Sequence, residues 1–257
     1  MIEHHRSFRI QNAKSATRRH AMGWFGALTL APFLPRAGLA HDLVSEDANS
    51  SGAKRDLAKI VHESEHMLDD LLYHSKASDS IMDHLRQARA VIVIPGLFKA
   101  GFLVGLEAGT GLLLARTQDR SWSYPAFLKF TGASLGFQFG YQEARLLLLV
   151  MTDGGFSNLL KRPVSIGGEL SAAIGGVGDG YNAATTANLG VDLISYMDTS
   201  GLFLGASLEG SLLQKADDLT GIYYGEDQAT IRTVVLDGQY ANPDANRLRQ
   251  ILETSER

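Results

Sequence analysis

Residues 90–116 read A-V-I-V-I-P-G-L-F-K-A-G-F-L-V-G-L-E-A-G-T-G-L-L-L-A-R, and this stretch decides the fold. It is too apolar to be exposed to water, and its glycines make it a poor helix. β-branched residues dominate positions 91–94 and Pro95-Gly96 follows them, which is typical of a strand that ends in a turn. From Gly101 onward, glycines alternate with larger apolar residues, and this alternation predicts a second strand.

Glycine recurs at i and i+4 on one face of three predicted strands, at residues 101–109, 132–140 and 201–210. Because glycine weakens a strand, the repetition indicates a sharp bend or the close approach of another backbone. We therefore predict an α+β fold. N-terminal helices pack on a strongly curved, glycine-rich, mainly antiparallel β-sheet or partial barrel, and a short C-terminal helix completes the domain.

Three segments with different compositions divide the chain. Residues 1–40 combine a basic N-terminal part, an apolar stretch at 21–34 and a small-residue end, which predicts an export signal. The pair Arg18-Arg19 resembles a twin-arginine signal, although the ordinary secretory route and an uncleaved interfacial anchor remain alternatives. Residues 41–52 are predicted to be a polar linker, and residues 53–257 a single domain. We expect an exported protein of the periplasm or cell envelope.

The charge balance narrows the classes of partner. The chain has 24 basic and 28 acidic residues, and residues 1–40 hold six of the bases and one of the acids. The remainder therefore carries 18 bases and 27 acids, a net charge of −9. Such a chain is a poor candidate for nucleic-acid binding, which depends on neutralising phosphates. Cysteine is absent, so disulfides, thiolate metal sites and cysteine nucleophiles are excluded.

Local patterns predict the other elements. An amphipathic helix is expected at 53–74, and a second helix, capped by Ser78, is expected to run to about residue 89. A turn at 118–121, a buried strand at 145–151, a short helix at 156–161 and a strand at 164–174 follow. A glycine-rich loop at 175–180 precedes a hairpin of strands 189–196 and 201–213. A last strand is predicted at 230–236, and Asn242-Pro243 starts a terminal helix.

The sharpest catalytic motif is His62-Glu63-Ser64-Glu65-His66, an H-E-x-x-H sequence. On a helix, His62 and His66 could share a zinc ion with Glu63 as the base, which makes a zinc hydrolase one alternative. The helical periodicity instead places both histidines opposite the apolar arc, on the solvated face. We therefore expect no metal site and no cofactor, and we expect the glycine-rich loop to be a connection and not a phosphate cradle.

Many short motifs in fixed order resemble the SYLF domain, a lipid-binding module that is also described as the actin-binding domain of certain yeast endocytic proteins. The segments that carry the resemblance are Pro95-Gly96-Leu97-Phe98-Lys99-Ala100-Gly101-Phe102, Gly109-Thr110-Gly111, Trp122-Ser123, Pro125-Ala126-Phe127, Gly132 to Gly140, Ser195-Tyr196, Gly201-Leu202-Phe203, Ser207 to Ser211 and Tyr224-Gly225. They extend over most of the predicted domain.

The resemblance implies a non-enzymatic protein that binds membrane lipids, namely phospholipids or phosphoinositide-like lipids. The candidate lipid-binding residues are Lys54, Arg55 and Lys59 on the first helix, together with Phe98 and Lys99. An exported protein is not expected to meet actin, so actin is not an expected partner. A zinc hydrolase and a purely structural envelope protein remain the alternatives.

Overall fold

The computed structural model describes the backbone of residues 39–175, 190–199, 202–203 and 208–255. Side chains are described for the same residues except 39–50, 99–105, 133–143, 199 and 202–203. The predicted export signal and the glycine-rich loop beyond Gly175 therefore lie outside the described residues. The helices are α1 (Leu39–Asp69), η1 (Asp70–His74), α2 (Ser78–Gln87), α3 (Asp153–Lys161), α4 (Asp217–Tyr224), α5 (Ile231–Val235), η2 (Pro243–Ala245) and α6 (Asn246–Thr254). The strands are β1 (Ala90–Ala115), β2 (Ala126–Val150), β3 (Val164–Ser165), β4 (Ala172–Ile174), β5 (Leu193–Thr199), β6 (Leu202–Phe203) and β7 (Leu212–Lys215).

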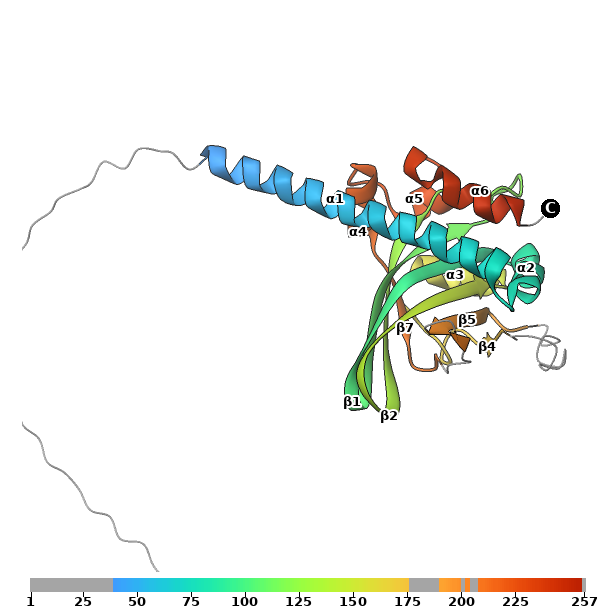
Figure 1. Cartoon of the computed structure of the whole chain (residues 1–257). Coiled ribbons are helices and arrows are strands. Elements are labelled where there is room, and N and C mark those ends of the chain that lie inside the picture. Colours follow the sequence, from blue (N-terminus) through green and yellow to red (C-terminus); the bar gives the residue numbers. More distant parts are fainter. Residues whose placement is uncertain (1–38, 176–189, 200–201, 204–207, 256–257) are drawn as a thin grey trace, which may run out of the picture.

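The predicted α+β fold is confirmed, and its centre is one long antiparallel pair, β1 and β2 (Figure 1). These two strands, β3, β5, β6 and β7 pair antiparallel, whereas β4 pairs parallel to β5. Pro95-Gly96 was predicted to be a turn, which is wrong. The residues form a register shift between Ile94 and Leu97, so the chain continues in the same strand. A bulge of this kind bends a strand without ending it.

The two halves of β1, residues 90–98 and 106–115, lie side by side. The Arg116 amide donates to the carbonyl of Arg89 over 2.9 Å. A Cβ atom placed on Gly109 would lie 2.9 Å from the carbonyl oxygen of Gly96, and one placed on Gly111 would lie 2.8 Å from that of Val93. The glycines at 109 and 111 therefore face a backbone at close range, as the repeated spacing predicted.

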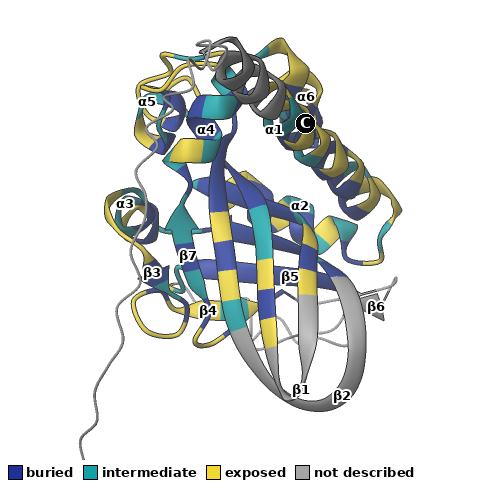
Figure 2. Ribbon diagram, turned by 90° about the vertical axis from the view of Figure 1, so that its left-hand side faces the viewer, coloured by how far each residue is buried: buried dark blue, intermediate teal, exposed yellow. Residues whose placement is uncertain are grey.

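Both faces of this curved sheet are buried near the ends of its long strands, at residues 90–94, 111–115, 126–128 and 146–150, whereas Figure 2 shows exposed residues farther along the β1–β2 pair. Val91, Val93 and Leu147 face a cluster with side chains from α1, α2, α4 and α6. Ile92 and Leu148, one residue further along each strand, face a second cluster with side chains from α3 and α5. A strand covered on both sides has a continuous apolar sequence, which explains why residues 91–94 and 146–150 show no polar alternation.

Five further assignments from the sequence differ from the structure. Residues 41–52 belong to α1 and do not form a linker. The cap of α2 is Ala77, and Ser75 Oγ accepts from its amide. The predicted strand at 164–174 is broken by Gly167, whose φ is +84°, and β7 starts only after Gly210, whose φ is +83°. Residues 231–235 form helix α5, because Thr230 and Thr233 make a capping box.

Other assignments are confirmed. The turn at 118–121 joins β1 to β2, α3 covers the predicted short helix, and Asn242 Oδ1 accepts from the Asp244 amide at the start of the last helical segment. Helix α4 had no predicted counterpart. It begins after Ala216, whose amide donates to the carbonyl of Phe127 on β2, so tertiary contact sets its position.

Candidate functional site

The predicted lipid-binding residues fall into two separate places. Lys54, Arg55 and Lys59 lie on α1, and their side chains are exposed. Phe98 lies at the end of the first half of β1. Lys99 follows it in the same strand, and its side chain is not among those that the structure describes. Figure 1 shows that the lower end of the β1–β2 pair is distant from α1. The structure therefore does not bring the helix bases and Phe98 together.

The apolar arc of α1 is used by the core. Leu57 is 4% exposed, and Val61 and Leu68 are each 1% exposed within the cluster beneath the helix. Burial of this face leaves the described part of α1, from residue 51 onward, without an apolar surface that could enter a membrane. Lys59 Nζ lies 3.4 Å from Glu63 Oε1, which reduces the positive charge that this face offers.

The middle of β1, between its two halves, carries an apolar surface that the core does not cover. Phe98 is 47% exposed and Leu106 is 68% exposed, although both are strand residues. Phe98 is the last described side chain of the first half of β1, and Leu106 is the first of the second half. We call these two residues the apolar edge. Phe98 belonged to the predicted site, whereas Leu106 was missed, because the alternation assigned it to a face that was expected to be buried.

The inward-facing residue next to Leu106 is acidic. Glu107 follows Leu106 directly and is 7% exposed, on the opposite face of the strand. Alternation along the strand therefore separates an inward carboxylate from outward apolar side chains. Ala108, two residues after Leu106 and on the same outward face, is also exposed and has no charge. The apolar edge is thus a surface of the strand itself and not a disturbed part of the core.

The H-E-x-x-H motif lies on the solvated face of α1, as predicted. His66 Nε2 is 3.1 Å from His62 Nε2, and the His62 side chain is 65% exposed. The carboxylate of Glu63 is paired with Lys59 and is therefore not placed to act as a base on a metal-bound water. Among the described residues, no group of three histidines or carboxylates is placed to hold a metal ion. Within the described part of the chain, these histidines have no third ligand beside them, which a catalytic zinc site requires.

In the described part of the chain, no helix has the length and apolar content that a membrane span requires.

Comparison with known proteins gives a consistent family. Residues 131–255 match the family model Ysc84, described as Las17-binding protein actin regulator. An SH3 domain-containing protein of Schizosaccharomyces pombe is 34% identical over 157 residues, which are 60% of this chain and 36% of that protein. LAS seventeen-binding protein 3 of Saccharomyces cerevisiae is 30% identical over 176 residues, 67% of this chain and 38% of that protein.

A human relative, SH3 domain-containing YSC84-like protein 1, is 30% identical over 137 residues, 53% of this chain and 40% of that protein. The matched part spans 36–40% of the length of these three curated relatives. The family match covers most of β2 and the strands and helices that follow it. The resemblance recognised from the sequence motifs is confirmed, and the chain belongs to the Ysc84 family, that of the SYLF domain.

Proposed function

We propose that this protein binds membrane lipids without enzymatic activity and that the apolar edge, Phe98 and Leu106, enters the membrane. The observation that carries the proposal is the exposure of these two side chains, 47% and 68%, on a strand whose other described large apolar residues are buried. Transfer of a Phe or Leu side chain from water to an apolar environment contributes about 1.5–3 kcal/mol. The sequence between them, K-A-G-F-L-V-G, adds apolar residues and one base.

A lipid surface fits this edge better than a protein partner does. Stable protein interfaces bury about 800 Å² on each partner, which is far more than two side chains supply. Peripheral membrane attachment can instead rest on a few inserted apolar residues with a nearby base. Because the net charge beyond residue 40 is −9, attraction to anionic lipids must be local, and we expect binding that is only partly sensitive to salt.

The test is co-sedimentation with vesicles of phosphatidylcholine, with and without phosphatidylglycerol. The double variant Phe98→Ser, Leu106→Ser should lose pelleting. Leu236→Ser is the matched control, because Leu236 is a 40% exposed apolar residue on another part of the surface. The charge-reversal variant Lys54→Glu, Arg55→Glu, Lys59→Glu should pellet like the unaltered protein. Equal pelleting of the double variant and the unaltered protein would overturn the assignment of the edge.

Actin is a second candidate, because the matching family model is described as an actin regulator. Co-sedimentation with actin filaments, in the absence of vesicles, tests it directly. Pelleting with filaments, together with no pelleting on any vesicle, would replace the lipid proposal by a filament-binding one.

We further propose that the protein is exported to the cell envelope. The basic, apolar and small-residue order of residues 1–40 supports this proposal. The predicted cleavage point, after Ala40, coincides with the first residues of α1. An envelope fraction should contain a chain that begins near His41, and Arg18→Lys with Arg19→Lys should block export on the twin-arginine route. An intact Met1 on protein in the cytoplasmic fraction would contradict the proposal.

A further inference from the structure

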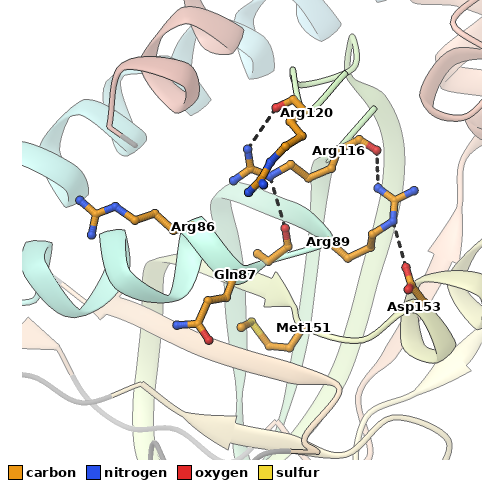
Figure 3. Close-up of a pocket in the computed structure, with 8 residues that line it drawn as sticks. Arg86, Gln87, Arg89, Arg116, Arg120, Met151 and Asp153 are labelled. Carbon is orange, nitrogen blue, oxygen red and sulfur yellow. Dashed lines mark hydrogen bonds and ion pairs between the residues drawn. The ribbon is translucent and has the colours of Figure 1, made fainter. Parts of the chain in front are cut away.

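A cavity of about 250 Å³ lies where the end of α2, the two ends of the β1–β2 pair and the start of α3 meet (Figure 3). It is separate from the apolar edge, which flanks the middle of β1, whereas both ends of β1 lie at the cavity. Its lining contains four arginines and one carboxylate: Arg86, Gln87, Ala88, Arg89, Arg116, Arg120, Met151 and Asp153. A cavity with this excess of positive charge is suited to an anion.

The guanidinium of Arg116 is fixed in place by carbonyls and by a ring. It donates to the carbonyls of Leu85 at 3.0 Å, Ala88 at 3.4 Å and Arg120 at 3.3 Å. It also lies 4.3 Å from the centre of the buried Trp122 ring. The carbonyls at the end of α2 therefore face a cation instead of the cavity, and these contacts hold the cation in one defined orientation.

Arg89 and Asp153 form an ion pair on the opposite wall. Arg89 Nε donates to Asp153 Oδ1 over 3.1 Å, and the guanidinium lies 4.6 Å from the Phe156 ring centre. Asp153 is 89% exposed, whereas the Arg89 side chain is 28% exposed. An exposed carboxylate on a half-buried guanidinium is a partner that another anion can displace, because solvent screens the pair and little is lost when the carboxylate returns to water.

Arg120 is the free cation of the site. Its φ of 68° places it in the left-handed region at the tip of the turn between β1 and β2. Across the part of the chain that the structure describes, its guanidinium has no carboxylate or hydrogen-bond partner. Arg86, in contrast, is paired with Asp83 Oδ1 at 2.7 Å, and in Figure 3 its guanidinium points away from the other three. The guanidinium groups that can turn toward an incoming anion are therefore those of Arg89 and Arg120, beside the fixed guanidinium of Arg116.

We propose that this arginine pocket, Arg89, Arg116 and Arg120, binds the phosphate group of a small phosphomonoester. Guanidinium groups match the tetrahedral oxygens of phosphate with paired hydrogen bonds, and a dianion offers more charge than one carboxylate does. Drug-sized ligands occupy roughly 300–1,000 Å³, so a cavity of about 250 Å³ fits a phosphate with a short organic group. The incoming phosphate takes the place of Asp153 on Arg89 and recruits the Arg120 guanidinium.

The test is titration calorimetry of the full chain with glycerol 3-phosphate and with inorganic phosphate at constant ionic strength. Arg120→Gln should weaken binding about tenfold, the effect of one hydrogen bond to a charged group. Asp153→Asn should strengthen binding, because the competing carboxylate is removed. Arg232→Gln and Asp237→Asn are exposed, charge-matched controls outside the pocket and should leave the affinity unchanged.

Two outcomes would overturn the proposal. One is that neither the unaltered protein nor Asp153→Asn binds either phosphate ligand. The other is that Arg120→Gln and Arg232→Gln lose affinity equally, which would indicate a general charge effect. Vesicles that contain phosphatidic acid distinguish the source of the phosphate. Binding of vesicles that is lost in Arg120→Gln assigns a lipid headgroup, whereas binding of glycerol 3-phosphate alone assigns a soluble ligand. Phe98→Ser should retain phosphate binding, so failure of the membrane proposal is seen separately.

Discussion

At the scale of single residues, Gly111 shows how the fold of β1 depends on the absence of a side chain. A Cβ atom at this position would lie 2.6 Å from Ile94 Cγ1 and 2.8 Å from the Val93 carbonyl oxygen. The Val93 oxygen belongs to the backbone and cannot move aside by a side-chain rotation. Gly111→Val should therefore destabilise the protein by about 1–3 kcal/mol through overpacking. Urea denaturation measures the change.

Gly96→Ala is the control for that substitution, because nothing lies within 4 Å of a Cβ atom placed on Gly96. Its free energy of unfolding should stay within about 0.5 kcal/mol of the unaltered value, as for most exposed positions. Equal stability of Gly111→Val and Gly96→Ala would mean that the two halves of β1 can separate without cost, which contradicts the packing described above.

His84 is a buried histidine that should make stability depend on pH. Its pKa is lowered from 6.5, chiefly because burial removes water from the charged ring, although Asp83 and Ser80 act in the opposite direction. Its Nδ1 lies 2.5 Å from the hydroxyl of Tyr196 on β5, whose pKa is raised by burial to about 12. Tyr196 therefore keeps its proton at neutral pH and can donate it to a neutral His84.

The neutral imidazole is thus favoured in the folded protein, whereas unfolded His84 binds a proton near its ordinary pKa. The unfolded state then holds more protons than the folded state, so stability falls as the pH drops from about 7 to about 5. Denaturation of the unaltered protein and of His84→Gln across this range should show a smaller slope in the variant. An identical slope would assign the acid sensitivity to other groups.

At the scale of elements, α5 depends on a local hydrogen-bond pattern that outweighs β propensity. The Thr230 hydroxyl accepts from the Thr233 amide over 3.3 Å, and the Thr230 amide donates to Thr233 Oγ1 over 2.8 Å. Thr230→Ala should cost about 1 kcal/mol, the usual effect of losing such a cap. Thr254→Ala, at an exposed position at the end of α6, is the control, and thermal unfolding should separate the two variants. Equal melting temperatures would contradict the role of the cap.

At the scale of the whole molecule, Arg145 joins the helical layer to the sheet. Its guanidinium donates to Asp70 Oδ2 over 2.7 Å and also contacts Asp198 Oδ2 on β5, whose side chain is 4% exposed. Arg145→Met should destabilise the protein by roughly 2–3 kcal/mol, because the buried carboxylate of Asp198 loses this cation. Denaturation with urea measures the loss.

Lys129→Met is the matched variant for this contact. The Lys129–Asp218 pair also bridges two elements over 3.2 Å, but both side chains are largely exposed, at 46% and 63%. Exposed pairs contribute about 0–1 kcal/mol, so this variant should lose much less stability than Arg145→Met. Similar losses in both variants would show that burial of Asp198 does not govern the effect.

The sequence by itself determined which residues are buried, and with them the class of the fold. The unbroken apolar runs at 91–94 and 146–150 specify strands that are covered on both faces, and the arc of Leu57, Val61 and Leu68 specifies an amphipathic helix. The spacing of His62 and His66 likewise specifies a solvated pair, because period and side-chain direction are local properties of a helix. The family motifs are also local, and they sufficed to recognise the SYLF domain.

Only the tertiary structure decided the continuity of β1 through Pro95-Gly96, the use of the α1 arc and the two candidate binding surfaces. Whether Pro95-Gly96 turns or bulges depends on the partner strand, which is distant in sequence. Leu106 is 68% exposed in the folded chain, although its place in an apolar strand favours burial. Arg89, Arg116 and Asp153 come together because β1 folds back beside itself and brings its two ends to the start of α3. Contacts between distant segments set these features, and no local pattern encodes such contacts.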